Sequence, residues 1–284
     1  MTMTHASLFS GIGGFDLAAE WAGWTNAFNC EIDPFCRRIL KYHFPIAEQY
    51  ADIRTTDFTI WRGRIDVLTG GFPCQPFSLA GKRKGTEDDR YLWPEMLRVI
   101  RNIRPRWVVG ENVFGIVNWS EGVVFEQVCS DLETAGYAVQ PYIIPACGVG
   151  APHRRDRCWF VAHRTDAGVE TMRERQDGVH AVGNAPDTDC ERCHEFQSPA
   201  QPSQTQERIT QNSHAKRRIP DWNDFPTQSL VCWRNDGISG GLDGITFPKW
   251  RNMSIKAYGN AIVPQVALQI FKTINEYEKH ARKH

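Results

Sequence analysis

The sequence predicts an α/β fold in which a parallel sheet is covered by helices on both faces. Two observations lead to this prediction. Over the first 160 residues, short apolar runs alternate with amphipathic stretches of helical length, which is typical of strands joined by crossover helices. Glycine-rich turns follow two of the apolar runs, at Ser10–Gly14 and at Gly70-Gly71. Parallel sheets bind their ligands at such turns, beyond the carboxyl ends of the strands.

Strands are expected where a short apolar run stops at glycine or at an acidic residue. Ala6–Phe9 runs into the first glycine turn, and Val67–Thr69 runs into the second. Two further strands are expected to end at Glu31 and at Asp52-Ile53. The remaining expected strands are Trp107–Gly110, Ala138–Ile144 and Arg157–Ala162.

Helices are expected where apolar side chains recur every three or four residues. In the last segment, for example, Val266, Ile270 and Ile274 are spaced by four. We expect this last helix to follow a glycine turn at Tyr258–Pro264 and to pack back on the first domain. The expected helices are, in order, Phe15–Ala22, Pro34–His43, Tyr91–Ile103, Val123–Ala135 and one within Ile262–His284.

Composition is that of a globular protein with one large domain, or a domain and a small lobe. Of 284 residues, 41% are hydrophobic and 23% are charged. Lys plus Arg equals Asp plus Glu at 33 each, which argues against binding to nucleic acid or membrane through bulk positive charge. A local basic cleft remains compatible with that balance. We expect no signal peptide and no membrane span, and the nine irregularly spaced cysteines favour a reducing cytoplasm.

The composition divides the chain into three parts. Residues 1–162 carry the alternating pattern and form the first expected domain. Residues 163–250 form a loop-rich region, which is polar as far as Arg218 with Phe196 as its one aromatic residue, before tryptophans return at Trp222, Trp233 and Trp250. Residues 251–284 form a C-terminal segment that is expected to return to the first domain.

Acidic residues beyond the glycine turn predict a nucleoside cofactor. Glu31 follows the glycines at the distance where a carboxylate accepts hydrogen bonds from a ribose. Asp52 can accept from an exocyclic amine, and Ile53 can pack on a purine face. Taken singly, each acid is more often a solvated surface residue. Their order after the glycine turn favours the cofactor site.

Gly70–Ser78 carries the sharpest chemical signal. Cys74 lies between Pro73 and Pro76, and the prolines hold its thiol at the tip of a loop. A thiolate in such a position is a good nucleophile, and a buried structural cysteine is the weaker interpretation. The basic run that follows is either a solvated charge run or a loop that closes over a phosphate-bearing substrate.

Acid–base and anion-binding groups come later. Glu111 stands at the carboxyl end of a central strand, where an acid can take part in proton transfer. Arg155 and Arg157 precede and begin another strand, and guanidinium groups bind carbonyl oxygens or phosphates.

Together these motifs resemble those of the DNA (cytosine-5) methyltransferases, in the same order. The matching motifs are Phe9–Gly14, Gly71–Ser78, Glu111–Val113, Arg155–Arg157 and Gly259–Pro264. The resemblance covers residues 6–162 and 255–275. It implies a Rossmann-like catalytic domain that uses S-adenosylmethionine, and a small, loop-rich target-recognition lobe at residues 163–250.

The resemblance also assigns roles to individual residues. Cys74 matches the nucleophile, Glu111 the acid that engages the cytosine ring, and Arg157 the arginine beside it. Arg155 is grouped with these catalytic residues. The expected substrate and DNA contacts are Gln75, Ser78, Lys82, Arg83 and Lys84. The expected cofactor-lining residues are Phe9, Gly11, Ile12, Gly13, Gly14, Glu31, Ile32, Asp52, Ile53, Pro73, Leu92 and Asn260.

Two departures from the family pattern stand out. His153 replaces a glutamine, and Arg234–Gly237 stands near the place of the penultimate motif without matching it well. No metal site is expected, because Cys190 and Cys193 form a single C-x-x-C pair without a second pair nearby.

Two alternatives and several partners follow from the same resemblance. The same chemistry on RNA is the first alternative, and a catalytically silent DNA-binding protein is the second. Intact Cys74, Glu111 and Arg157 argue against the second. The implied partner is double-stranded DNA, with a cognate restriction endonuclease left open. The protein is expected to be a cytoplasmic monomer of bacterial, phage or mobile-element origin.

Overall fold

The computed structural model describes residues 2–73, 91–165 and 247–281. All of them belong to one compact unit. Most of the expected lobe at 163–250 therefore lies outside the described residues, and the three-part division stays a prediction. Within the described residues, no helix is both long and apolar enough to cross a membrane.

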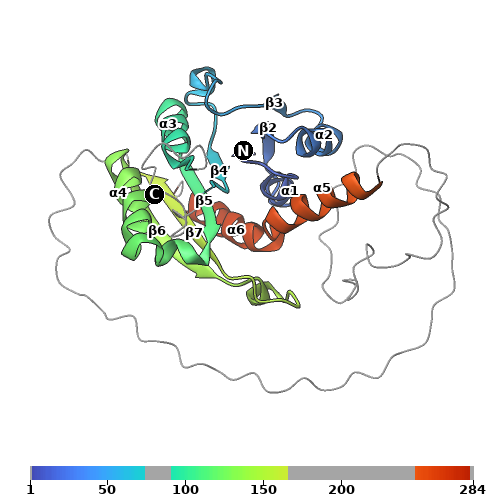
Figure 1. Cartoon of the computed structure of the whole chain (residues 1–284). Coiled ribbons are helices and arrows are strands. Elements are labelled where there is room, and N and C mark those ends of the chain that lie inside the picture. The colour runs from blue at the N-terminus through green and yellow to red at the C-terminus, as the bar shows by residue number, and fades with distance from the viewer. Residues whose placement is uncertain (1, 74–90, 166–246, 282–284) are drawn as a thin grey trace. The chain divides into compact units, whose positions relative to one another are not determined.

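The described residues form a seven-stranded sheet with the order β3-β2-β1-β4-β5-β7-β6 (Figure 1). The strands are β1 (Thr4–Leu8), β2 (Thr25–Cys30), β3 (Glu48–Tyr50), β4 (Val67–Gly70), β5 (Trp107–Val113), β6 (Tyr137–Ile144) and β7 (Arg157–Arg164). Strands β1 to β5 pair in parallel, as the sequence predicts. Strand β7 is antiparallel to both of its neighbours.

The antiparallel strand is a difference from the predicted all-parallel sheet. Strands β6 and β7 are joined by residues 145–156, which contain the short 3-10 turn Ala146–Val149 and no crossover helix. Without a crossover helix the chain returns beside β6 in the opposite direction. Strand β7 thereby fills the space between β5 and β6.

Six α-helices accompany this sheet in the described residues. They are α1 (Gly14–Trp21), α2 (Pro34–His43), α3 (Trp93–Ile103), α4 (Val123–Thr134), α5 (Phe247–Asn260) and α6 (Pro264–Ala281). Local chemistry sets their ends. At the start of α2, Oδ1 of Asp33 accepts a hydrogen bond from the amide of Phe35 at 2.8 Å, and Pro34 occupies the first position.

The prediction of a glycine turn at Tyr258–Pro264 is wrong for its first three residues. Residues 258–260 form the last turn of α5, and only residues 261–263 connect α5 to α6. The amide of Ala261 still bonds to the carbonyl of Ala257 at 3.1 Å. The break falls just before Pro264, because proline disfavours helical geometry in the residue that precedes it.

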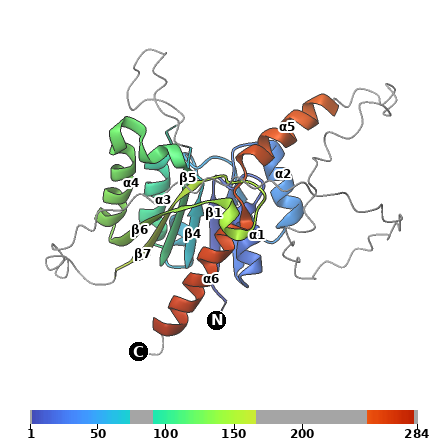
Figure 2. The same ribbon diagram turned by 90° about the horizontal axis from the view of Figure 1, so that it is seen from below.

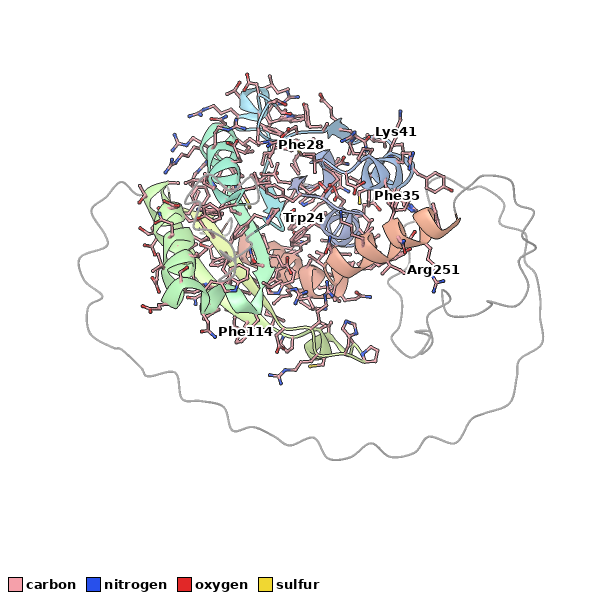
Figure 3. The ribbon with its side chains drawn as sticks, in the orientation of Figure 1. Trp24, Phe28, Phe35, Lys41, Phe114 and Arg251 are labelled. Atoms are coloured by element: carbon pink, nitrogen blue, oxygen red, sulfur yellow. The ribbon has the colours of Figure 1, made fainter. Side chains whose placement is uncertain are left out.

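Helices cover both faces of the sheet (Figure 2), and an apolar cluster on each face holds them in place. The face covered by α3 and α4 contains Leu68, Val108, Phe160, Met96, Ile100 and Leu132. The face covered by α1 and α6 contains Val67, Val109, Trp159, Phe15, Val266 and Phe271. Neighbours such as Val108 and Val109 go to opposite faces, as strand geometry requires. Figure 3 labels Phe28 of the first cluster and Trp24 of the second.

Helix α6 returns to the first part of the chain. The ring of Phe271 stacks on Trp24 with centroids 4.4 Å apart, and Asn275 Oδ1 accepts from Trp24 Nε1 at 2.8 Å. Near the end of the helix, the buried carboxylate of Glu278 accepts from Trp107 Nε1 at 2.9 Å and contacts Arg106. These bonds fix the C-terminal helix against the start of β5.

Candidate active site

The predicted site residues gather at one edge of the sheet, which we call the carboxyl edge. Because β1 to β5 are parallel, all five end there, and the antiparallel β7 begins there. The strand order also reverses between β1 and β4, which is where open α/β sheets bind their ligands. Residues that follow or end these strands are Phe9, Glu31, Asp52, Pro73 and Glu111, and Arg157 begins β7.

The glycine turn after β1 uses left-handed backbone conformations. Phe9, Gly11 and Gly13 all have positive φ angles, of 52°, 57° and 88°. A left-handed Phe9 is strained by about 1–2 kcal/mol, and such strain is concentrated at functional sites. At Gly14, a Cβ atom would lie 2.7 Å from Cγ1 of Ile262, so only glycine allows this close approach. Ile12 of the same turn packs against α2 and α5.

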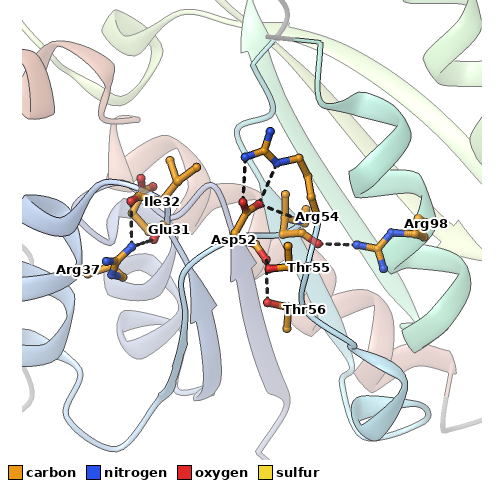
Figure 4. A network of polar contacts seen from close by, with 9 residues as sticks. Glu31, Ile32, Arg37, Asp52, Arg54, Thr55, Thr56 and Arg98 are labelled. Carbon is orange, nitrogen blue, oxygen red and sulfur yellow. Dashed lines mark hydrogen bonds and ion pairs between the residues drawn. The ribbon is translucent and has the colours of Figure 1, made fainter. Parts of the chain in front are cut away.

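Backbone amides on both sides orient the carboxylate of Glu31, and Figure 4 shows its own backbone carbonyl bonded to Arg37. Its Oε2 accepts from the amide of Gly11 at 2.7 Å, and its Oε1 accepts from the amide of Asp33 at 2.8 Å. Arg37 Nη1 donates to the carbonyls of Glu31 and Ile32 at 3.1 and 2.8 Å. Because each carboxylate oxygen has two lone pairs, both can accept a further hydrogen bond from a ligand hydroxyl.

Asp52 is held by its neighbour Arg54 (Figure 4). The guanidinium donates to the two carboxylate oxygens at 3.1 and 2.8 Å, and the amide of Arg54 adds a bond of 3.0 Å. These hydrogen bonds hold the pKa of Asp52 below its usual value, so it is an ionised acceptor at neutral pH.

The apolar residues of the predicted cofactor site fall into two groups. Ile32 is 60% exposed at the carboxyl edge, where its side chain is available to a ligand. Ile53 is only 5% exposed and belongs to the apolar cluster under α3, so it is chiefly a core residue. Leu92 is half-buried at the start of α3, and Asn260 is exposed at the end of α5.

Glu111 and Arg157 form an ion pair at this edge. Arg157 Nε lies 3.0 Å from Oε1 of Glu111, and Glu111 is 9% exposed. Burial raises the pKa of Glu111 to about 7, while Arg157 and Arg155 oppose the rise. Gly71 borders the same carboxylate, since a Cβ there would lie 3.4 Å from Oε2. A carboxyl group with a pKa near neutrality is suited to proton transfer.

Asn112 is a candidate site residue to which the sequence analysis gave no role of its own. Its Nδ2 donates to the carbonyl of Phe72 at 3.0 Å, and its Oδ1 accepts from the amide of Val113 at 2.9 Å. The amide of Leu92 bonds to the carbonyl of Pro73 at 3.4 Å. Asn112 thus fixes the backbone just before Cys74, and its signal in the sequence is its place between Glu111 and Val113.

Residues 74–90 lie outside the described residues, but both flanks of this segment meet at the carboxyl edge through the bond between Leu92 and Pro73. The predicted nucleophile Cys74 is among them, as are the expected DNA contacts Gln75, Ser78, Lys82, Arg83 and Lys84. Cys190 and Cys193 also lie outside the described part. Within that part, no group of three or more His, Cys, Asp or Glu side chains could hold a metal ion.

Arg155 contacts backbone carbonyls rather than the carboxylate of Glu111. Its Nη2 donates to the carbonyls of Gly259 and Ala261 at 2.9 and 2.6 Å. These carbonyls lie where α5 ends and α6 approaches, and a cation is favourable at the C-terminal end of a helix. The predicted catalytic arginines therefore differ in position, because Arg157 pairs with the acid and Arg155 ties the β6–β7 connection to the segment around Asn260.

The comparison with known protein families decides the classification. Residues 3–233 match the family described as C-5 cytosine-specific DNA methylase. The chain belongs to this family. The resemblance found in the sequence and the Rossmann-like α/β fold class are thereby confirmed. Members of this family transfer a methyl group to carbon 5 of cytosine in DNA.

Curated relatives share this family. The chain is 38% identical over 175 residues to the type II methyltransferase M.AquIA of Picosynechococcus sp., covering 56% of this chain and 71% of the relative. It is 37% identical over 168 residues to M.Eco47II of Escherichia coli, covering 57% and 40%. It is 30% identical over 166 residues to M.HhaI of Haemophilus parahaemolyticus, covering 58% and 50%. The match thus spans half or less of the latter two relatives.

A solved structure shows the same fold. A mutant of Spodoptera frugiperda DNMT2 superimposes with a TM-score of 0.50 at 22% identity, covering 59% of this chain and 51% of that chain. The likeness concerns the fold alone.

Proposed function

We propose that the protein transfers a methyl group from S-adenosylmethionine to carbon 5 of cytosine in double-stranded DNA. The observation that supports this most is the ion pair between the buried Glu111 and the half-buried Arg157, which stands beside the backbone that leads into Cys74. An acid with a pKa near 7 can donate a proton to the ring nitrogen of a cytosine at neutral pH. Family membership supports the choice of DNA over RNA.

The residues at the ends of β1, β2 and β3 fit a nucleoside cofactor. Glu31 keeps lone pairs for the ribose hydroxyls, and the ionised Asp52 suits an exocyclic amine. The exposed Ile32 offers an apolar surface to a purine, and the backbone at Gly11, where an added Cβ would meet nothing within 4 Å, leaves room for the ligand. When bound, S-adenosylmethionine supplies the electrophilic methyl group that carbon 5 takes up.

The chain's own residues make carbon 5 reactive. The Cys74 thiolate attacks carbon 6, which forms a sulfur–carbon bond and breaks the double bond between carbons 5 and 6. Glu111 donates its proton to the ring nitrogen, so that an enamine forms and carbon 5 becomes nucleophilic. Arg157 holds the carboxyl group of Glu111 in place. After methylation, loss of the carbon 5 proton to a base expels the thiolate, and the ring nitrogen returns its proton to Glu111, which restores the ring.

This chemistry requires the target base to leave the duplex. A thiolate cannot reach carbon 6 while the base is stacked between its neighbours, so the cytosine must be flipped into the site. The names of the relatives favour a restriction-modification setting, in which a cognate endonuclease cuts the same sequence. A cytoplasmic monomer is part of the same proposal.

Bisulfite sequencing of DNA from a methylation-free host that expresses the protein tests the proposal. Cytosines protected in one short sequence context, with protection lost in Cys74→Ala, are the expected result. No protected cytosine despite soluble expression would instead favour RNA as the substrate or a silent DNA-binding protein. Covalent trapping on DNA that contains 5-fluorocytosine separates an active DNA methyltransferase from a silent DNA-binding protein, because the trap forms only with an active thiolate.

A further inference from the structure

A fully buried carboxylate lies beneath the glycine turn and has no part in the mechanism above. Asp16 stands in the first turn of α1, two residues after Gly14, and is 0% exposed. Both of its carboxylate oxygens lie 3.0 Å from Oγ of Ser7 on β1. In the described part of the chain it forms no ion pair. A buried carboxyl group without a cation costs stability unless hydrogen bonds compensate it, so its presence needs an explanation.

Asp16 ends a chain of hydrogen bonds that starts beside Glu31, the residue predicted to bind the ribose. The amide of Cys30, which precedes Glu31, donates to Oγ of Ser10 at 3.1 Å. Oγ of Ser10 lies 2.6 Å from Oγ of Ser7, which in turn donates to Asp16. Ser10 is also the first residue of the glycine turn after Phe9. The chain therefore joins the turn, the end of β2 and the start of α1.

The number of available protons decides which group donates in each bond of this hydrogen-bond chain. A serine hydroxyl has one proton to donate. If Asp16 is ionised, Ser7 donates to it, and Ser7 must then accept from Ser10. The oxygen of Ser10 accepts from Cys30, so every donor points toward the carboxylate. Hydrogen bonds that end on a charged acceptor are stronger than neutral ones.

Protonation of Asp16 reverses the direction. Its own hydroxyl then donates to Ser7, and Ser7 donates to Ser10. The hydroxyl of Ser10 turns to the carbonyl of Ser7 at 3.1 Å or of Cys30 at 3.2 Å. Every group is satisfied in both arrangements, so the chain has two states that differ in how Ser10 is bonded.

We propose that Asp16 is a positioning residue, which acts through Ser7 and Ser10 to fix the glycine turn and the end of β2 for the cofactor. The inference rests on the proposed function, because it concerns the same cofactor site. The ionised state, with its charge-assisted chain, holds the turn more firmly and binds the cofactor more tightly. Asp16 itself touches neither the cofactor nor the cytosine in this role.

The environment of Asp16 brings its protonation into the physiological range. Burial raises the pKa of Asp16 to about 7, the bond from Ser7 opposes the rise, and Glu20 on the same helix adds to it. On the strands packed against it, His5 has a pKa lowered to about 4, and Cys30 has one raised to about 12. The face of α6 that covers α1 is apolar. Among these groups, Asp16 is the one expected to titrate between pH 6 and 8.

Calorimetric titration of the full-length protein with S-adenosylmethionine at pH 6, 7 and 8 tests the inference without relying on turnover. The wild-type Kd is expected to fall by about fivefold from pH 6 to pH 8. In Asp16→Asn the amide donates to Ser7 as the protonated acid does, so the Kd should stay at the wild-type pH 6 value at every pH. If this variant keeps the wild-type pH dependence, the inference is wrong.

Further variants keep the test decisive if Asp16→Asn does not fold. Ser7→Ala breaks the chain between Asp16 and Ser10 and should also remove the pH dependence. Thr69→Val, which removes a buried hydroxyl bonded to His5 on the neighbouring strand, is the matched control and should keep it. Glu111→Gln should also keep the pH dependence, since Glu111 titrates in the same range but is not part of the hydrogen-bond chain.

The proposed function and this inference fail in different ways. Wild-type protein that binds no S-adenosylmethionine contradicts the proposed function and removes the basis of the inference. Wild-type protein that binds it with a pH dependence that survives in Ser7→Ala contradicts the inference alone.

Discussion

Arg157 Nε lies 3.0 Å from Oε1 of Glu111, and the two residues reach each other from neighbouring antiparallel strands. Arg157 is paired with Val113, two residues beyond Glu111 on β5. Residues two apart on a strand share a face, so this register puts the guanidinium beside the carboxylate. The antiparallel direction of β7 is therefore what brings the arginine to the carboxyl edge.

Replacing Glu111 by glutamine tests the proton donor. Burial raises the pKa of Glu111 from 4.5 to about 7, so the acid holds its proton below pH 7 and loses it above. Wild-type kcat/KM should therefore decline as the pH rises through about 7 on this limb. Glu111→Gln should lower kcat by about 10²–10⁴ and lack that limb. Glu121→Gln is the control, because Glu121 is an exposed acid between β5 and α4. A pH profile unchanged in Glu111→Gln would contradict the assignment.

Replacing Arg157 by alanine tests its action on Glu111. The guanidinium favours the charged carboxylate and opposes the effect of burial. Without it the pKa of Glu111 should rise further above 7, and the alkaline limb of the pH–rate profile should move to higher pH. The maximal rate should fall at the same time, because the carboxyl group loses a fixed partner. A lower rate with the limb in its wild-type position would mean that Arg157 acts on the substrate alone.

Asn112→Ala should affect both stability and catalysis. It leaves the carbonyl of Phe72 and the amide of Val113 without their side-chain partner, which costs about 1–3 kcal/mol for a buried group. Because Phe72 leads into Cys74, kcat should fall more than the affinity for S-adenosylmethionine. Thermal unfolding, calorimetry and rate measurements read out the three effects. Asn118→Ala replaces an exposed residue between β5 and α4 and should change none of these three quantities. Equal losses in kcat and cofactor affinity would contradict this role.

Local sequence patterns predicted most of the fold because they report local physics. The expected helix at Pro34–His43 has the observed bounds, since Asp33 and Pro34 mark its start chemically. The short strands before Glu31 and Asp52 were also predicted, from the acids that follow them. The direction of β7 was missed, because apolar periodicity does not specify which strand will be the neighbour.

The parts of the site that sequence reasoning missed depend on contacts between distant segments. Arg155 meets the carbonyls of Gly259 and Ala261, more than a hundred positions away in the chain. Asp16 reads as an ordinary polar residue in an amphipathic helix, and only the approach of Ser7 on β1 shows that it is buried and bonded. Residue types identified the chemistry, whereas the packing of β1, β7 and α5 decided which partners each group meets.

A close approach between the glycine turn and the C-terminal segment gives a last prediction. A Cβ on Gly14 would lie 2.7 Å from Cγ1 of Ile262, in the connection that leads to α6. Alanine is the better helix former, so Gly14→Ala would stabilise α1 by about 1 kcal/mol if this contact were absent. We expect the opposite, a loss of about 1–3 kcal/mol from overpacking, with weaker binding of S-adenosylmethionine.

A double-mutant cycle checks that this loss comes from the contact. Ile262→Ala removes the clashing atom, so the combination with Gly14→Ala should be more stable than the sum of the two single losses predicts. Gly148→Ala is the control, because its Cβ would meet only Pro145 at 3.8 Å. Additive losses in denaturant unfolding would contradict this role of the contact between Gly14 and Ile262. A favourable coupling would establish that the cofactor turn and the α5–α6 connection are packed as one unit, which is what a site lined by both segments requires.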